Sequence, residues 1–197
     1  MVDPLAHVLT ALKASGNASS DFDLNPEIKL PETRKLRSAG VLVAMIMHKG
    51  EPHVILTKRA SHLKHHPGQI AFPGGKQDEG DADVIAAALR EAQEEVGLNP
   101  DVVEVLGTLP AHETVTGFAV TPVIARATGD FHPTPEPGEV DEVFLVPLSH
   151  VTTVARFSIQ GRRWRGSKRY YFTVPWGPYY IWGATARILR ALAERMV

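Results

Sequence analysis

The stretch from Asp83 to Val96 is the sequence feature that most restricts how this chain can fold. Its apolar side chains recur at the spacing that places them on one helical face: Ile85, Leu89, Ala92 and Val96. Asp81 or Asp83 can cap the start of such a helix, and Gly97, shortly before an Asn-Pro pair, is typical of a helix end. The sequence therefore predicts an amphipathic helix that needs another layer of structure to cover its apolar face.

Short apolar and β-branched runs predict strands on both sides of this helix, at residues 40–47, 53–57, 102–109, 118–127 and 143–147. Helical spacing predicts a short helix at 3–14 and a final amphipathic helix at 182–196, and the polar residues of 15–31 indicate a loop. The elements do not alternate as in a parallel sheet, so we expect an α+β fold with a mixed sheet. Residues 1–35 are expected to form an N-terminal helix and loop, and residues 36–197 the main domain with its C-terminal helix.

Composition narrows the classes of function. The 197 residues contain no cysteine, which excludes disulfides, thiolate metal sites and cysteine nucleophiles. The net charge of -1 gives no overall field that would attract nucleic acid or a membrane surface. No apolar run approaches the roughly 20 residues that a bilayer requires, and no serine lies in a recognisable elbow or triad pattern. We expect a cytoplasmic protein without membrane contact, monomeric or homodimeric, for which nucleic acid is an unlikely partner.

Three glutamates of the predicted helix gather on one strip of its surface. Glu91, Glu94 and Glu95 are three and four residues apart, and like charges so placed cost an isolated helix roughly 0.2 to 0.5 kcal/mol per pair. A hard cation such as Mg2+ or Mn2+, which prefers oxygen ligands, would relieve the repulsion. The alternative is a set of ordinary exposed glutamates, with Arg90 and Glu94 forming an ion pair one turn apart.

The residues before and within this helix resemble the Nudix box, GX5EX7REUXEEXGU, in which U is aliphatic. The matching segment is GGKQDEGDADVIAAALREAQEEVGL, and its second half fits well apart from the small Ala92 at an aliphatic position. The first half departs from the pattern, because fourteen residues separate Gly75 from Arg90 and Ala82 replaces the first glutamate. That glutamate usually supports the arginine, and Asp81 and Asp83 are the candidates to replace it here.

The resemblance implies a Nudix fold, in which a mixed β-sheet is sandwiched between helices (α/β/α), with the N-terminal and C-terminal helices as additions. It also implies metal-dependent hydrolysis of a pyrophosphate bond. The implied metal ligands are Glu91, Glu95, Glu94 and the carbonyl oxygen of Gly75, and the implied catalytic group is Glu91, Arg90 and Glu94. Glu91 is the nearest candidate for the general base, and three later glutamates are alternatives or extra ligands: Glu113, Glu139 and Glu142.

A second segment, LTKRASHLKHHPGQIAFPGG, is similar to the extra signature of the coenzyme A pyrophosphatase subgroup, LLTxR(S/A)x3Rx3Gx3FPGG. Lys64 stands where arginine is usual, and IWGATARIL near the C-terminus resembles the usual ending of that subgroup. This resemblance implies hydrolysis of coenzyme A, or its acyl thioesters, to 3',5'-ADP and 4'-phosphopantetheine. Arg59, Lys64 and the backbone of Gly74 are the expected substrate-binding groups, because the substrate carries phosphates outside the metal site.

Several alternatives remain open at this point. An ADP-ribose or other nucleoside diphosphate-linked pyrophosphatase would use the same helix, and a non-catalytic Nudix module would sense a ligand or bind RNA. The basic stretch of residues 156–172 fits either RNA or a solvated surface hairpin. The histidines of the second segment fit phosphate contact, hydrogen bonding or ordinary surface positions: His62, His65 and His66. The late aromatic residues are expected to pack the last helix, with adenine stacking as the alternative: Trp176, Tyr179, Tyr180 and Trp182.

Overall fold

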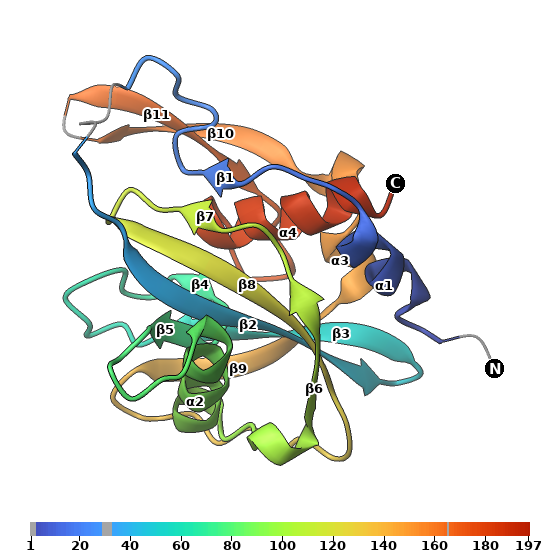
Figure 1. Ribbon diagram of the computed structural model, residues 1–197. Coiled ribbons are helices and arrows are strands. Elements are labelled where there is room, and N and C mark those ends of the chain that lie inside the picture. Colours follow the sequence, from blue (N-terminus) through green and yellow to red (C-terminus); the bar gives the residue numbers. More distant parts are fainter. Residues whose placement is uncertain (1–2, 29–32, 165) are drawn as a thin grey trace.

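A mixed sheet with helices on both faces forms the body of the protein, in a computed structural model that describes residues 3–28, 33–164 and 166–197 (Figure 1). The helices are α1 (Ala6–Lys13), α2 (Val84–Val96), α3 (Leu148–Val151) and α4 (Gly183–Arg195), with the 3-10 turns η1 (Pro100–Val102) and η2 (Val154–Arg156). In these ranges, no helix has the length and apolar character needed to cross a membrane.

The main sheet contains nine strands: β1 (Ser19–Ser20), β2 (Arg37–His48), β3 (Glu51–Arg59), β4 (Ile70–Ala71), β5 (Gly74–Lys76), β6 (Val103–Thr108), β7 (His112–Glu113), β8 (Phe118–Ala127) and β9 (Val140–Pro147). β2 lies at its centre, parallel to β8 and antiparallel to β3 and β5. Outside this sheet, β10 (Ser158–Trp164) and β11 (Ser167–Thr173) form an antiparallel hairpin. The predicted mixed sheet is confirmed.

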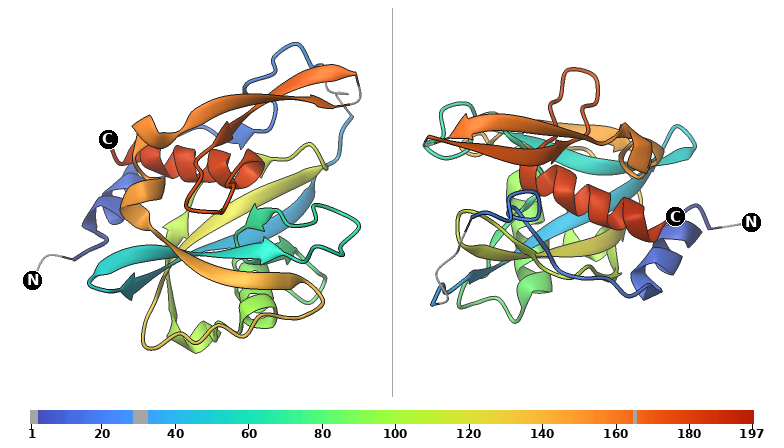
Figure 2. Two further views of the ribbon diagram at one scale, coloured as in Figure 1. Left: turned by 180° about the vertical axis from the view of Figure 1, so that it is seen from behind. Right: turned by 90° about the horizontal axis from the view of Figure 1, so that it is seen from above.

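Alternating side chains of β2 supply two separate apolar cores. Leu42 and Ala44 pack into the core under α2, whereas Val43 and Met45 pack into the core shared with α1 and α4. This is the period-two alternation expected of a strand buried on both faces. Figure 2 shows α2 on one side of the sheet and α4 with the β10–β11 hairpin on the other. The α/β/α sandwich is confirmed.

The predicted helices and longer strands are all present, but the structure corrects one local expectation. The loop expected at 15–31 contains β1, which pairs in parallel with β7. The structure also adds two short strands around Phe72, because β4 stops at Ala71 and the two glycines begin β5. The basic stretch forms the β10–β11 hairpin, and its Arg165 lies outside the described residues.

Candidate functional site

The position of α2 is set by its two caps and by a close approach to β2. The side chain of Asp83 accepts hydrogen bonds from the backbone N–H groups of Ile85 and Ala86, and Gly97 ends the helix in a left-handed conformation. A Cβ at Gly40 would lie 2.1 Å from the carbonyl oxygen of Val84, so only glycine lets β2 pass this near the helix start. In the sequence, Gly40 stands at the beginning of an apolar run, and the close approach that requires it was not predicted.

Two glutamates of α2 lie against the glycine pair of β5. A Cβ added at Gly75 would stand 2.6 Å from the carboxylate of Glu91, and the N–H of Gly74 donates a hydrogen bond to Glu95 Oε2 at 3.1 Å. Glu95 is only 5% exposed. The structure therefore brings together Gly74, Gly75, Glu91 and Glu95, which are the residues to which the resemblance assigns metal and substrate binding.

Arg90 is braced by Asp81, which is one of the two predicted replacements for the missing glutamate. Its Nε and Nη2 atoms donate to the two carboxylate oxygens of Asp81 at 3.0 and 2.9 Å. Nη1 donates to Glu91 and Glu94 at 3.0 Å each. The hydrogen bond with Arg90 lowers the pKa of Asp81 to about 2, so this fork remains charged at all ordinary pH values. Asp83 has the separate role of helix cap.

Burial makes negative charge on the carboxylates of the site unfavourable. It raises the pKa of Glu95 to about 7, against the lowering effect of the Gly74 hydrogen bond, while the charges of Glu91 and Glu139 raise it further. Burial also raises the pKa of Glu91, and the hydrogen bond from Arg90 opposes that rise. The site thus holds carboxylates that would gain from a nearby cation.

The donor set suits a metal that retains water and substrate ligands. Among the described residues, no three acidic or histidine side chains are arranged to hold a metal ion by themselves. Arg90 donates hydrogen bonds to both Glu91 and Glu94. Mg2+ is commonly bound by one or two carboxylates together with substrate phosphate oxygens. Glu91 and Glu95 could supply those carboxylates, whereas Glu94 is exposed and would have to leave Arg90 to join them.

Only one of the three later glutamates is close to this group. The charge of Glu139, at the entry to β9, acts on both Glu91 and Glu95. Glu113 instead forms an ion pair with Arg34 at 2.9 Å. Glu142 accepts a hydrogen bond from the hydroxyl of Tyr179. The partners of Glu113 and Glu142 thus separate them from Glu139, and this difference could not be predicted from the sequence alone.

Arg59, at the end of β3, extends the site beyond the carboxylates. Its positive charge acts on Glu95, and its buried Nε has no hydrogen-bond partner among the described residues. Lys64 is exposed in the loop after Arg59. His62, His65 and His66 are exposed in the same loop, and His66 shares a hydrogen bond with Gln69. The structure therefore places Arg59 beside the acidic group and Lys64 at the surface.

A family model for the NUDIX domain matches residues 36–165 of this chain. The chain belongs to the Nudix family. It is 45% identical to the uncharacterized Nudix hydrolase NudL of Enterobacter sp. (strain 638), over 80% of this chain and 81% of that protein. NudL of Citrobacter koseri is 42% identical over 86% of this chain and 88% of its own length. As a Nudix hydrolase, this protein acts on a phosphoanhydride bond.

The Nudix domain of Shewanella oneidensis NrtR, solved with ADP ribose, has the same fold with a TM-score of 0.52. It is 18% identical, and the match covers 88% of this Nudix hydrolase and 93% of that chain. Enzymes of this family typically require a divalent metal ion, in agreement with the donor set formed by Glu91 and Glu95.

This Nudix hydrolase also contains a Ser–His–Asp arrangement that no sequence pattern predicted. Ser19 Oγ and Asp21 Oδ1 lie 2.9 and 3.1 Å from the two ring nitrogens of His112. Serine nucleophiles need access to substrate, but Ser19 is 6% exposed and His112 is fully buried. These hydrogen bonds therefore hold β1 and the residue after it against β7. No local signal could have revealed them, because up to 93 residues separate the partners.

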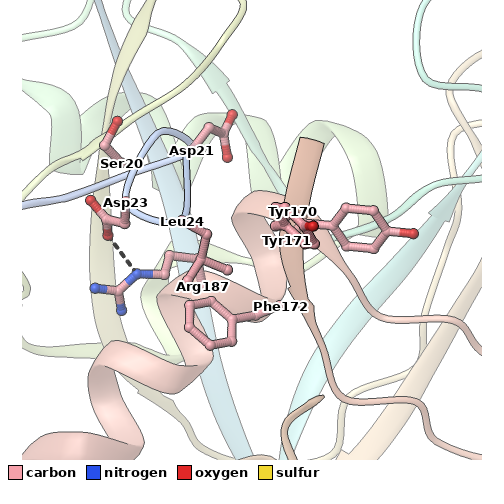
Figure 3. Close-up of a pocket in the computed structure, with 9 residues that line it drawn as sticks. Ser20, Asp21, Asp23, Leu24, Tyr170, Tyr171, Phe172 and Arg187 are labelled. Carbon is pink, nitrogen blue, oxygen red and sulfur yellow. Dashed lines mark hydrogen bonds and ion pairs between the residues drawn. The ribbon is translucent and has the colours of Figure 1, made fainter. Parts of the chain in front are cut away.

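A small pocket lies next to the Ser19–His112–Asp21 hydrogen bonds, between the N-terminal segment, β11 and α4 (Figure 3). Arg187 closes one side through an ion pair with Asp23 at 2.8 Å, and Phe172 lies beside the Arg187 side chain. Asp21, on another wall, is already bonded to His112 and to the N–H of Val115. The polar groups of these walls thus hold the N-terminal segment in place.

Proposed function

We propose that this Nudix hydrolase cleaves the pyrophosphate bond of coenzyme A, and of its acyl thioesters, with Mg2+ or Mn2+ as cofactor. The products would be 3',5'-ADP and 4'-phosphopantetheine or its acylated form. We also propose that the enzyme is cytoplasmic, that its substrate is a small molecule, and that it acts as a monomer or homodimer. The observation that supports it is the position of Arg59, from the segment that resembles the coenzyme A subgroup, beside the buried Glu95 of the segment that resembles the Nudix box.

The charges of the substrate fit this arrangement. A diphosphate is a stable polyanion, and it can be hydrolysed only if its charge is neutralised and a water molecule is held in line with the scissile bond. Arg59 offers a guanidinium with an unpaired buried Nε, and the absence of a side chain at Gly75 lets the Glu91 carboxylate lie directly against the backbone of β5. Lys64 adds positive charge at the exposed rim.

The proposed residues divide the chemistry among them. A divalent ion, when bound, would neutralise phosphate oxygens and lower the pKa of a water molecule. Glu91, Glu95 and the Gly75 carbonyl would hold it, and Glu94 would serve a second or substrate-bound ion. Arg90, held by Asp81, fixes the orientation of Glu91, while the Gly74 N–H fixes Glu95.

Glu139 is the candidate we favour for the general base. Its charge acts on both proposed metal ligands, and its backbone is fixed by hydrogen bonds with Ala60 and Glu136. In the proposed step, the water oxygen bonds to phosphorus as the bridging P–O bond breaks. The water proton passes to Glu139, and the bridging oxygen leaves on the departing phosphate.

A substrate panel scored by product identity tests the proposal. Coenzyme A, acetyl-coenzyme A, ADP-ribose and a diadenosine polyphosphate would each be incubated with purified protein and Mg2+ or Mn2+. We expect 3',5'-ADP and 4'-phosphopantetheine from coenzyme A at the highest kcat/KM, and at least about a hundredfold loss in E91Q. Intact coenzyme A beside rapid hydrolysis of ADP-ribose would overturn the substrate assignment. Binding without turnover of any compound would indicate a ligand-sensing module.

A further inference from the structure

One face of the β10–β11 hairpin combines aromatic rings with positive charge. Arg162 lies directly opposite Arg169 in the register of the hairpin, and Tyr171 is two residues beyond Arg169. Side chains two residues apart in a strand share a face, so these three point to the same side. Tyr180 and Trp182, from the segment after β11, complete what we call the Tyr171 face.

The aromatic part of this face is built around Tyr171. Its ring lies 5.0 Å from that of Trp182 with a tilt of 60°, and its hydroxyl lies 3.4 Å from the hydroxyl of Tyr180. Tyr180 remains 46% exposed. By contrast, Tyr179 stacks on Phe144 with centroids 3.6 Å apart, so it packs against the body as predicted. An exposed ring beside a tilted aromatic pair offers a stacking surface for a planar ligand.

The charged part of the face favours an anion. Arg162 and Arg169 stand directly opposite each other in the hairpin, so both bring positive charge to this face. The pKa of Tyr171 is raised by its hydrogen bond with Tyr180 and by burial, and the charge of Arg162 opposes that rise. Arg162 therefore acts on the aromatic cluster itself. Two guanidinium groups on one face are suited to bind a phosphate.

The Tyr171 face adjoins the loop that runs from Arg59 to β4. Trp182 precedes Gly183, where an added Cβ would lie 3.7 Å from Gln69 Nε2, which belongs to that loop. Arg59, at the start of the loop, acts through its charge on Glu95. The Thr185 hydroxyl also donates to the carbonyl of Ile70, in β4, at 3.0 Å.

We propose that the Tyr171 face binds the nucleoside end of the substrate, a purine nucleotide that carries an additional phosphate on its ribose. The base lies against Tyr180 and Trp182, and the ribose phosphate is held by Arg162 and Arg169. This inference rests on the proposed function, because coenzyme A has such a 3'-phosphate outside its diphosphate. It adds the residues that distinguish this substrate from nucleotides without the extra phosphate.

The test compares coenzyme A with 3'-dephospho-coenzyme A, which differ only in that phosphate. We expect the wild type to favour coenzyme A, and R162Q to lower kcat/KM for coenzyme A by about tenfold, the effect of losing roughly 1.4 kcal/mol of binding. For 3'-dephospho-coenzyme A, R162Q should stay within about twofold of wild type. R163Q is the matched control, since Arg163 is exposed and alternates to the opposite face of the same hairpin. It should leave the ratio of the two substrates unchanged.

Tyr180→Ala tests the base separately. Stacking does not depend on the ribose phosphate, so kcat/KM should fall at least about fivefold for both substrates alike. Equal wild-type rates on the two compounds, or equal losses on both in R162Q, would overturn the site while leaving coenzyme A hydrolysis intact. An unchanged Y180A would overturn the base position. Failure of the wild type to hydrolyse either compound would overturn the proposed function, and the site with it.

Discussion

Glu95→Gln is predicted to stabilise the metal-free protein while it abolishes most of the activity. Glu95 is 5% exposed, and burial raises its pKa from 4.5 to about 7. A buried carboxylate of this kind favours its protonated form, so ionisation weakens the folded state. Glutamine has nearly the same shape, carries no charge, and still offers an oxygen to the Gly74 N–H.

The pH dependence follows from the direction of this shift. Below pH 4.5 the carboxyl is protonated in both states and has no effect on stability. As pH rises from 4.5 to about 7, the unfolded chain loses its proton first, and the free energy of unfolding falls. Above that range the full cost applies, about 3 kcal/mol at 1.36 kcal/mol for each tenfold change in proton affinity. E95Q should escape this cost.

Denaturant unfolding in EDTA at two pH values measures the effect. At about pH 8, E95Q should exceed the wild type in free energy of unfolding by up to about 3 kcal/mol, and at about pH 4 the two should agree within about 0.5 kcal/mol. With Mg2+ or Mn2+, kcat of E95Q should fall at least about a hundredfold. Glu94→Gln is the matched control on the same helix, and because Glu94 is exposed its stability should change by less than about 0.5 kcal/mol. Equal destabilisation of E95Q at both pH values would refute the reasoning.

Three further predictions concern the neighbours of Glu95. Gly75→Ala places a Cβ 2.6 Å from the carboxylate of Glu91, which can give way only by leaving Arg90, so kcat should fall at least about tenfold with about 1 kcal/mol of destabilisation. Gly80→Ala, with open space around it, should be unaffected in kinetic assays. Asp81→Asn should lower kcat about tenfold by releasing the site arginine. The pKa of Asp81 is lowered from 3.8 to about 2, so ionised Asp81 stabilises the folded state above pH 3.8, and this stabilisation is lost as the pH falls through 2. In unfolding experiments, the mutant should therefore differ from wild type at neutral pH and approach it near pH 2. Glu139→Gln should reduce kcat at least about a hundredfold and remove the rise in rate on the acidic side of the pH-rate profile, because that rise reports ionisation of the general base. The same substitution at Glu113 or Glu142 should leave the pH-rate profile unchanged.

Elements with strong local signals were predictable from the sequence. The helix expected at 83–96 is found at Val84–Val96, because its cap residues, its apolar period and its terminal glycine all agree. β8 coincides with the predicted strand at 118–127. Very short strands such as β1 and β7 were missed, since a two-residue strand is defined only by its partner. Pairing between distant segments leaves no period in the local sequence.

The same distinction applies to the site. Helical spacing is a local property, and it places Glu91, Glu94 and Glu95 on one strip of the helix. The resemblance to the Nudix box, rather than the spacing, implied that these glutamates act together with Gly75, and the structure brings Glu91 and Glu95 against the glycine pair. The choice of Asp81 over Asp83 depends on how the turn before α2 folds back onto Arg90. The preference for Glu139 depends on where β9 enters the sheet beside Arg59, which the spacing of residues along the chain does not express.

The most direct test of the central claim is the position of Mn2+ in crystals soaked with the ion. We predict an anomalous density peak within coordination distance of the carboxylates of Glu91 and Glu95 and the carbonyl oxygen of Gly75. The same crystals of E95Q should show a weaker peak or none. A fully occupied peak elsewhere, or a Glu91–Glu95 pair that remains without metal at saturating Mn2+, would contradict the assignment of this helix as the metal site.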